Sequence, residues 1–175
     1  MSASFAIVVA ADEQRGIGRS GALPWRIARD MAFFRELTSK APLGKQNAVM
    51  MGRKTYASLP ARFRPLPHRL NVVLSRDPSY EPSGAIKADS LDRAMKELAG
   101  REDIHDRFVI GGGSLYAAAL DDARCTRVFI TRVHARLECD TYLAPFEHDF
   151  ELVTKDGPYH EGNLAFTFET YRRSR

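Results

Sequence analysis

The chain has 175 residues, of which 44% are hydrophobic and 27% are charged. This length suits one domain with its own apolar core, and the composition excludes a disordered, collagen-like or coiled-coil protein. The formal net charge of +4 comes without any recognition motif for nucleic acid, so we expect no nucleic-acid partner.

The N-terminus and the cysteines bear on location. The first eleven residues are apolar but lack a basic lead, and Asp12 ends the run far short of a membrane span or a signal peptide. Cys125 and Cys139 are the two cysteines and form no CxxC pair, which argues against structural zinc and against a disulfide framework. We therefore expect a soluble cytoplasmic protein without a metal site and without a membrane partner.

In chain order, short apolar runs alternate with helical patterns. Strands buried on both faces are expected at Phe5–Ala11, Asn47–Met51, Leu70–Ser75 and Phe108–Ile110, with a weaker candidate at Ala85–Ala88. Helices are expected between them, at Ile27–Thr38, Arg53–Leu59, Leu91–Ala99 and Ser114–Leu120.

Beyond Leu120 the patterns are those of strands alone. These are Arg127–Val133, Phe150–Lys155 and Leu164–Tyr171, with Gly157–Pro158 and Glu161–Gly162–Asn163 as turn material. The last two strands are expected to pair antiparallel. The sequence thus predicts one α/β domain over residues 1–175, with a mostly parallel eight-stranded sheet, an antiparallel C-terminal edge and about four flanking helices.

Three glycines, Gly16, Gly18 and Gly21, follow the first strand and precede the apolar step Leu23-Pro24-Trp25. Such a segment is either an ordinary surface loop that ends in a core tryptophan or a lid that excludes water from a reacting centre. The sequence leaves both interpretations open.

Asp30 lies within an apolar stripe formed by Ile27, Met31 and Phe34 on the first expected helix. An exposed carboxylate there would only favour the helix dipole. A carboxylate that faces the core or a cleft needs a cationic or multiply donating partner, and no arginine or lysine is obviously placed to supply it. A ligand with amidine-like N–H donors would serve.

Two junctions lead from a strand through glycine into a helix. Gly52 is followed by Arg53, Lys54 and Thr55, and the Gly111–Gly113 triplet opens the helix expected at Ser114. Free backbone N–H groups at such points bind anions, although neither sequence is a Walker A loop or a GxGxxG fingerprint. Basic residues also gather between positions 62 and 76, as a solvated surface or as sites for phosphates and carboxylates: Arg62, Arg64, His68, Arg69 and Arg76.

Taken in order over nearly the whole chain, these segments resemble dihydrofolate reductase, in a bacterial-type form. The further motifs that carry the resemblance are Phe33-Phe34, Arg69-Leu70-Asn71, Val73-Leu74-Ser75-Arg76, Ile110 to Tyr116, Thr131 and Asp140-Thr141. The acid is Asp rather than Glu, and Cys139 stands where glycine is common in the family. The stretch Pro60–Arg64 is slightly longer than in compact members, which leaves the role of Arg64 open.

The resemblance implies NADPH-dependent reduction of dihydrofolate, with antifolates as inhibitors and a monomer as the functional form. Asp30 would bind the amidine-like edge of the pterin and promote its protonation through water, Thr131 would hydrogen-bond Asp30, and Trp25 would hold that water. Arg69 would pair with the glutamate carboxylate of the substrate. The remaining substrate-binding residues would be Val8, Ala10, Met31, Phe34, Arg64, Leu66, Ile110 and Tyr116.

The resemblance also implies a cofactor site. Ala10, Ile17 and Gly18 would flank the nicotinamide. The phosphates, including the 2′-phosphate, would bind to Arg53, Lys54, Thr55, Ser75 and Arg76, and Leu23, Gly52 and Leu74 would complete the cofactor site. The pyrophosphate would lie on the segment Ile110, Gly111, Gly112, Gly113, Ser114, Leu115 and Tyr116, whose Gly111–Gly112 bond is typically cis in the family.

Two alternatives share part of this pattern. A pyrimidine reductase of riboflavin synthesis has the same fold and uses NADPH, but Trp25, Asp30 and Arg69 together argue against it. A non-catalytic NADPH-binding protein would keep the glycine-rich and arginine-rich segments without needing Asp30 or Thr131.

Overall fold

The apolar runs expected as strands form the centre of one twisted sheet in the computed structural model, which describes residues 3–175. The sheet has eight strands in the order β5-β4-β3-β6-β1-β7-β10-β9. They are β1 Phe5–Ala11, β3 Gln46–Gly52, β4 Arg69–Leu74, β5 Ile86–Ala88, β6 Ile104–Val109, β7 Cys125–Val133, β9 Phe150–Glu161 and β10 Leu164–Arg173. Neighbours from β5 to β7 run parallel, whereas β10 is antiparallel to both β7 and β9. The predicted fold class is confirmed.

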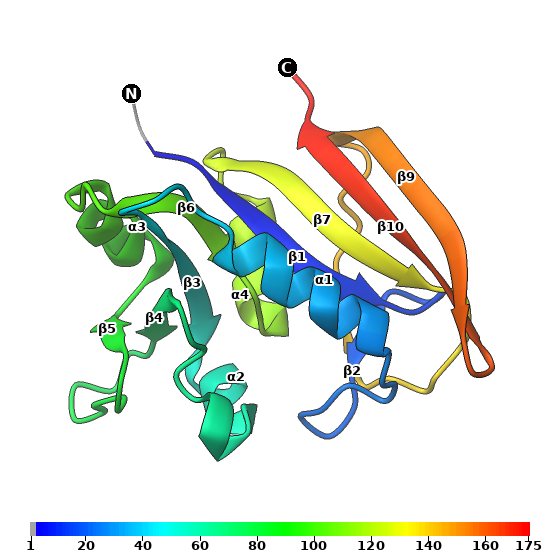
Figure 1. The fold of residues 1–175 in the computed structure, drawn as a ribbon, viewed down its shortest axis with the longest axis horizontal. Coiled ribbons are helices and arrows are strands. Elements are labelled where there is room, and N and C mark those ends of the chain that lie inside the picture. The colour runs from blue at the N-terminus through cyan, green and yellow to red at the C-terminus, as the bar shows by residue number, and fades with distance from the viewer. Residues whose placement is uncertain (1–2) are drawn as a thin grey trace.

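Helices cover both faces of this sheet (Figure 1). They are α1 Ala28–Ser39, α2 Arg53–Ser58, α3 Leu91–Ala99 and α4 Gly113–Leu120. Alternation along β1 explains the two layers, because successive side chains of a strand point to opposite faces. Ile7 and Val9 belong to the apolar cluster that includes α3 and α4, whereas Ala6 and Val8 belong to the cluster against α1 and α2.

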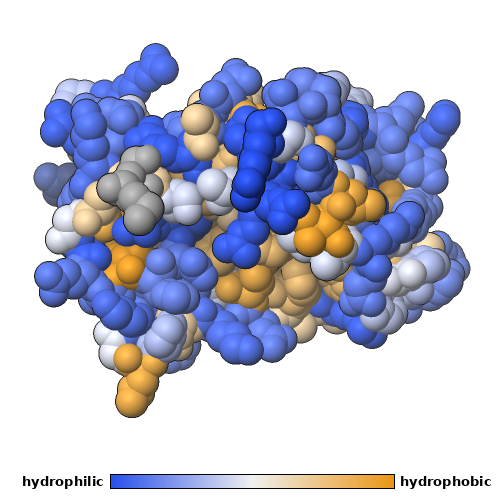
Figure 2. Space-filling view, turned by 90° about the horizontal axis from the view of Figure 1, so that it is seen from above, coloured by the Kyte–Doolittle hydropathy of each residue, from blue (hydrophilic) through white to orange (hydrophobic). Residues whose placement is uncertain are grey.

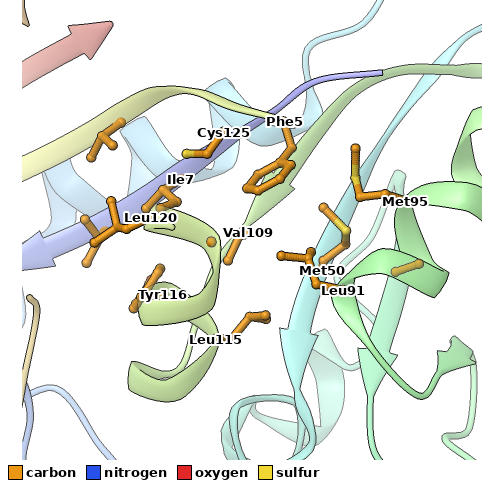
Figure 3. Packing of buried hydrophobic residues seen from close by; sticks show 14 of the residues in the cluster. Phe5, Ile7, Met50, Leu91, Met95, Val109, Leu115, Tyr116, Leu120 and Cys125 are labelled. Carbon is orange, nitrogen blue, oxygen red and sulfur yellow. The ribbon is translucent and has the colours of Figure 1, made fainter. Parts of the chain in front are cut away.

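The α3–α4 side of the core is closely packed. Leu115, Tyr116 and Leu120 of α4 and Leu91 and Met95 of α3 surround the strand residues Ile7, Met50 and Val109 (Figure 3). Ser90 caps α3, since its side chain accepts a hydrogen bond from the N–H of Arg93 at 3.1 Å. Much of the outside is hydrophilic, as the face in Figure 2 shows.

Several expected boundaries were wrong. Gly157 and Pro158 do not form a turn but lie inside β9, where the pairing with β10 shifts register between Phe166 and Phe168. Gly157 has φ of 125°, a conformation that glycine tolerates, so the pair forms an irregularity in a longer strand. β6 begins at Ile104 rather than Phe108, because its polar residues still pair in parallel with β3.

Three short elements have too few residues to show a periodic pattern. The strands β2 Gly16–Gly18 and β8 Thr141–Tyr142 pair with each other as a small separate sheet, and Ala61–Phe63 forms a 3-10 helix. The first pair matters for the site, because it fastens the glycine-rich loop to the segment after β7.

Glu147 joins the start of that loop to the main sheet. Its carboxylate accepts hydrogen bonds from Arg15 at 2.6 Å and from Arg132 of β7 at 2.8 Å. Burial by itself would raise the pKa of Glu147, but the two arginines outweigh it and lower the pKa to about 2.

Glu147→Gln should therefore reduce the free energy of unfolding near pH 7 by about 1–2 kcal/mol, allowing for solvent screening of a partly exposed side chain. The folded pKa lies below the unfolded value of about 4.3, so the contribution of the carboxylate is present above that value and is lost as the pH falls through about 2. Urea unfolding of both forms from neutral to acid pH should show the difference narrowing in this window. A difference that stays constant with pH would contradict the role of the charge.

Candidate functional site

Several predicted site residues lie at the carboxyl ends of the parallel strands, whereas Arg69 begins β4. Ala10 of β1 lies opposite Thr131 of β7, and the N–H of Gly52, at the end of β3, donates to the carbonyl of Gly111 at 2.9 Å. Ile110 follows β6 directly and donates to Met50 at 3.0 Å. Segments far apart in sequence thus meet at the lower edge of the sheet in Figure 1, the place where ligands bind in open α/β sheets.

Asp30 lies in the first turn of α1 with its carboxylate turned to β7. The hydroxyl of Thr131 donates to Oδ1 of Asp30 at 2.6 Å, which confirms the predicted contact. Burial raises the pKa of Asp30, and the bond from Thr131 offsets this only in part. The second oxygen accepts no hydrogen bond from residues 3–175, so the carboxylate can still accept from a ligand.

Tyr116 of α4 is buried on the opposite side of the sheet from α1. Its hydroxyl donates to the carbonyl of Val8 at 2.8 Å. Burial, followed by the negative charge of Asp30, raises the pKa of Tyr116, so the phenol stays neutral. The hydroxyl proton is thus committed to Val8, while the phenol oxygen can still accept a hydrogen bond.

Trp25 is buried among Ile27, Val133 and Phe166. Its Nε1 is buried yet donates to no protein atom within residues 3–175. Since buried N–H groups are almost always satisfied, this donor suits an ordered water.

The Gly111–Gly113 segment approaches α2 closely. The Gly111–Gly112 peptide bond is cis, as the resemblance implied, and φ of Gly111 is 137°. A Cβ at either Gly111 or Gly112 would lie 3.4 Å from the hydroxyl of Thr55. The helix that follows has Gly112 as N-cap, with no side-chain hydrogen bond, so the first N–H groups of α4 are free to meet an anion.

Basic residues border this segment on the α2 side. Arg53 and Lys54 are exposed at the start of α2, and Arg76 is exposed just after β4. Arg53 is already engaged, since it pairs with Asp77 at 3.2 Å and stacks on the ring of Tyr80. Asp77 and Tyr80 therefore orient the guanidinium of Arg53.

Arg69 is the buried arginine of the set. Its Nε donates to the carbonyl of Pro67 and its Nη1 to the hydroxyl of Thr38, both at 2.9 Å. Burial, with a smaller effect of nearby Arg35, lowers its pKa, but a guanidinium remains charged. The two bonds fix the plane of the guanidinium, whose Nη2 has no acceptor within residues 3–175. Arg64, by contrast, is exposed and donates to the carbonyl of Ala57 at 3.1 Å, over the outer side of α2.

The predicted side chains differ in burial. Met31 of α1 is 56% exposed. Phe34, one turn after Asp30, is the member of the stripe that packs against the sheet. Leu115 is buried in the core, which leaves only its backbone for a ligand, and Leu23 is 52% exposed.

The sequence interpretation missed the residues that hold the glycine-rich loop. The buried carboxylate of Asp12 accepts hydrogen bonds from the N–H groups of Gln14, Gly16 and Leu137 at 2.8–3.0 Å. Asp140 accepts from the N–H of Ser20 at 2.8 Å. Cys139 packs against Gly16, where a Cβ would lie 2.4 Å from its sulfur. A carboxylate directly after a buried strand was the available signal for Asp12.

Other features do not add to this site. A hollow of about 730 Å³ lies along α1 and the start of β6, between Phe33, Leu37, Lys40 and His105, and it does not include Asp30. In the part of the chain that the structure describes, no cluster of three or more His, Cys, Asp or Glu side chains could hold a metal ion. Within residues 3–175, no helix combines the length and apolar character needed to cross a bilayer.

Comparison with known proteins places the chain among named relatives. The family model described as dihydrofolate reductase matches residues 4–173. The dihydrofolate reductase of Heliothis virescens is 37% identical and aligns with 95% of this chain and 96% of its own length; that of Aedes albopictus is 38% identical, with 97% of each chain covered. The bifunctional dihydrofolate reductase-thymidylate synthase of Glycine max is 39% identical over 98% of this chain but only 34% of its own length. The chain thus spans about a third of that bifunctional relative and nearly all of the two others.

Proposed function

The chain belongs to the dihydrofolate reductase family, and we propose that it is an oxidoreductase that reduces 7,8-dihydrofolate to 5,6,7,8-tetrahydrofolate with NADPH. The observation that carries this proposal is the half-buried carboxylate of Asp30, oriented by Thr131 beside the strand ends and free to accept from a ligand. Mixing the protein with NADPH and dihydrofolate should produce loss of the NADPH absorbance. Loss with a ribosylaminopyrimidine, whose sugar can accept the hydride, but none with dihydrofolate would instead indicate the pyrimidine reductase.

The residues present fit a phosphorylated dinucleotide. The uncapped first turn of α4 and the glycines beside Thr55 supply backbone donors, and the exposed cations Arg53, Lys54 and Arg76 follow the ends of the paired strands β3 and β4. When bound, NADPH would supply the hydride. Ala10, Ile17, Gly18 and Leu23 would border its nicotinamide, and Gly52, Thr55, Leu74, Ser75 and Gly111–Leu115 its phosphates.

On the substrate side, Asp30 would hold the N–H donors of the pterin edge, between Val8, Ala10, Phe34 and Ile110. The Nε1–H of Trp25, which donates to no protein atom within residues 3–175, would hold a water. That water would carry the proton to the ring, because the indole cannot supply one. Leu66, Met31 and Tyr116 would complete the apolar lining. Antifolates with the same donor edge would bind Asp30 in the same way.

We also propose that the 175-residue chain acts as one reductase unit, as a monomer and in the cytoplasm. Both cysteines are buried free thiols, which suits a reducing compartment. Gel filtration with light scattering checks the monomer directly.

Asp30→Asn keeps the shape of the side chain and removes its charge. Because acid–base assistance typically contributes about 10²–10⁴-fold, hydride transfer to dihydrofolate should fall by that order at neutral pH, with NADPH affinity almost unchanged. The variant should recover activity as the pH falls, since substrate then arrives already protonated, whereas the wild type should depend on acid far less. Single-turnover measurements across pH test this. A loss below about threefold, or a parallel loss of NADPH binding, would leave Asp30 only a structural role.

Arg69→Lys tests the substrate tail. The structure already commits Nε and Nη1 of Arg69 to Pro67 and Thr38, and one ammonium cannot satisfy both and a carboxylate. The KM for dihydrofolate should rise about tenfold or more, since charge-assisted hydrogen bonds are worth about 1.5–3 kcal/mol. A pterin without the glutamate tail is the control substrate, and it should respond little. Equal losses for both substrates would make Arg69 purely structural.

Replacing Arg53 and Arg76 together with alanine tests cofactor choice. The loss of two cations beside a 2′-phosphate should weaken NADPH by about tenfold or more and NADH little. Arg62→Ala removes another exposed cation, one that stacks on Phe63, and serves as the matched control. Binding titrations with both cofactors give the answer, and equal weakening of NADPH and NADH would overturn the assignment.

A further inference from the structure

The helix that carries Asp30 has no N-terminal cap of its own. Its N-cap residue is Ile27, whose side chain cannot accept a hydrogen bond. The carboxylate of Glu161, at the end of β9, takes this place: it accepts from the N–H of Ala28 at 2.8 Å and from the N–H of Arg29 at 3.4 Å. A negative charge at this position also meets the positive end of the helix dipole.

Two more contacts join the same hairpin to α1. The guanidinium of Arg29 lies 3.6 Å from the ring centroid of Tyr159 on β9, and the ring of Phe33 lies 4.5 Å from that of Phe168 on β10. Arg29 and Phe33 are one turn apart on the helix, so they share a face. Figure 1 shows the β9–β10 hairpin reaching the N-terminal end of α1.

The same part of the sheet also holds the partner of Asp30. Thr131 of β7 is directly opposite Phe168 of β10 in the antiparallel pairing. Asp30 therefore follows the two peptide groups that Glu161 of β9 holds, and its own carboxylate is held by the hydroxyl of Thr131 on β7. The strands β7, β10 and β9 are consecutive in the sheet. We propose that Glu161 is a positioning residue for Asp30, acting through the first turn of α1; this inference rests on the proposed role of Asp30.

The physical argument is one of geometry. Helix ends fray, and the two capped N–H groups belong to the residues immediately before Asp30. Without the cap, the first turn can adopt other conformations, and the carboxylate then spends less time in the geometry that Thr131 and a bound pterin require. Small misplacements of a reacting group reduce the rate even when binding of the rest of the ligand is intact.

Glu161→Ala removes the acceptor, and Glu161→Gln keeps one oxygen that can still accept from Ala28. Glu151→Ala is the matched control, because Glu151 is at the other end of β9, where it pairs with Arg172 at 3.5 Å. In single turnovers with NADPH-loaded enzyme and saturating dihydrofolate, Glu161→Ala should slow hydride transfer about three- to tenfold. The rate of hydride transfer in Glu161→Gln and in Glu151→Ala should stay within about twofold of the wild-type rate. The NADPH affinity of all variants should also stay within about twofold of the wild-type affinity.

A double-mutant cycle separates positioning from general stability. If Glu161 acts through Asp30, Glu161→Ala should slow hydride transfer by less than about twofold in the Asp30→Asn background. Equal losses with and without Asp30, equal losses in the Glu151 control, or a wild-type rate in Glu161→Ala would each overturn the proposal. So would a Glu161→Gln variant as slow as Glu161→Ala.

A readout without catalysis keeps this inference distinct from the proposed function. Exchange of the Ala28 and Arg29 amide hydrogens, followed by NMR, should speed up in Glu161→Ala and not in Glu151→Ala. A wild-type protein that fails to reduce dihydrofolate would overturn the proposed function. Protection of the Ala28 and Arg29 amides that depends on Glu161 would still establish that Glu161 holds the first turn of α1. Unchanged hydrogen exchange at Ala28 and Arg29 in Glu161→Ala would show that Glu161 does not hold this turn, and would overturn the inference.

Discussion

The half-buried carboxylate of Asp30 is the constraint on which the rest of the site depends. Burial raises its pKa, and the hydroxyl of Thr131 meets one of its oxygens. A carboxylate removed from water needs donors, and those that the protein supplies are too few. This shortage, at the open end of a parallel sheet, favours a ligand with several N–H groups. It also explains why the helix that carries Asp30 has to be held in place from outside.

The fold meets that need by bringing together segments that the chain keeps apart. Parallel strands end at one edge of the sheet, so Ala10, Gly52, Ile110 and Thr131 become neighbours although they span most of the sequence. The irregular parts are fastened to this edge by polar contacts. Asp12 and Asp140 hold the glycine-rich loop, Glu147 ties its start to β7, and Glu161 caps α1.

Much of this arrangement could be predicted from the sequence. The helix Leu91–Ala99 and the strand Phe5–Ala11 were predicted with the observed bounds, because a cap residue and a continuous apolar run mark their ends. The cis Gly111–Gly112 bond and the contact between Thr131 and Asp30 followed from the family resemblance. What failed was a local pattern read without its partner strand: Gly157–Pro158 looked like a turn but lies inside β9.

The sequence by itself determined the alternation of strands and helices, the family and the residue types at the strand ends, because these depend on hydrophobic periodicity and on motifs in fixed order. Only the tertiary structure decided which charges meet. Arg15 pairs with Glu147, the N–H of Ala28 at the start of α1 donates to Glu161, and the N–H of Leu137 donates to Asp12; each of these pairs is more than a hundred residues apart in the chain. A hydrogen bond depends on distance in space, and no local pattern records which distant segment the sheet will bring beside it.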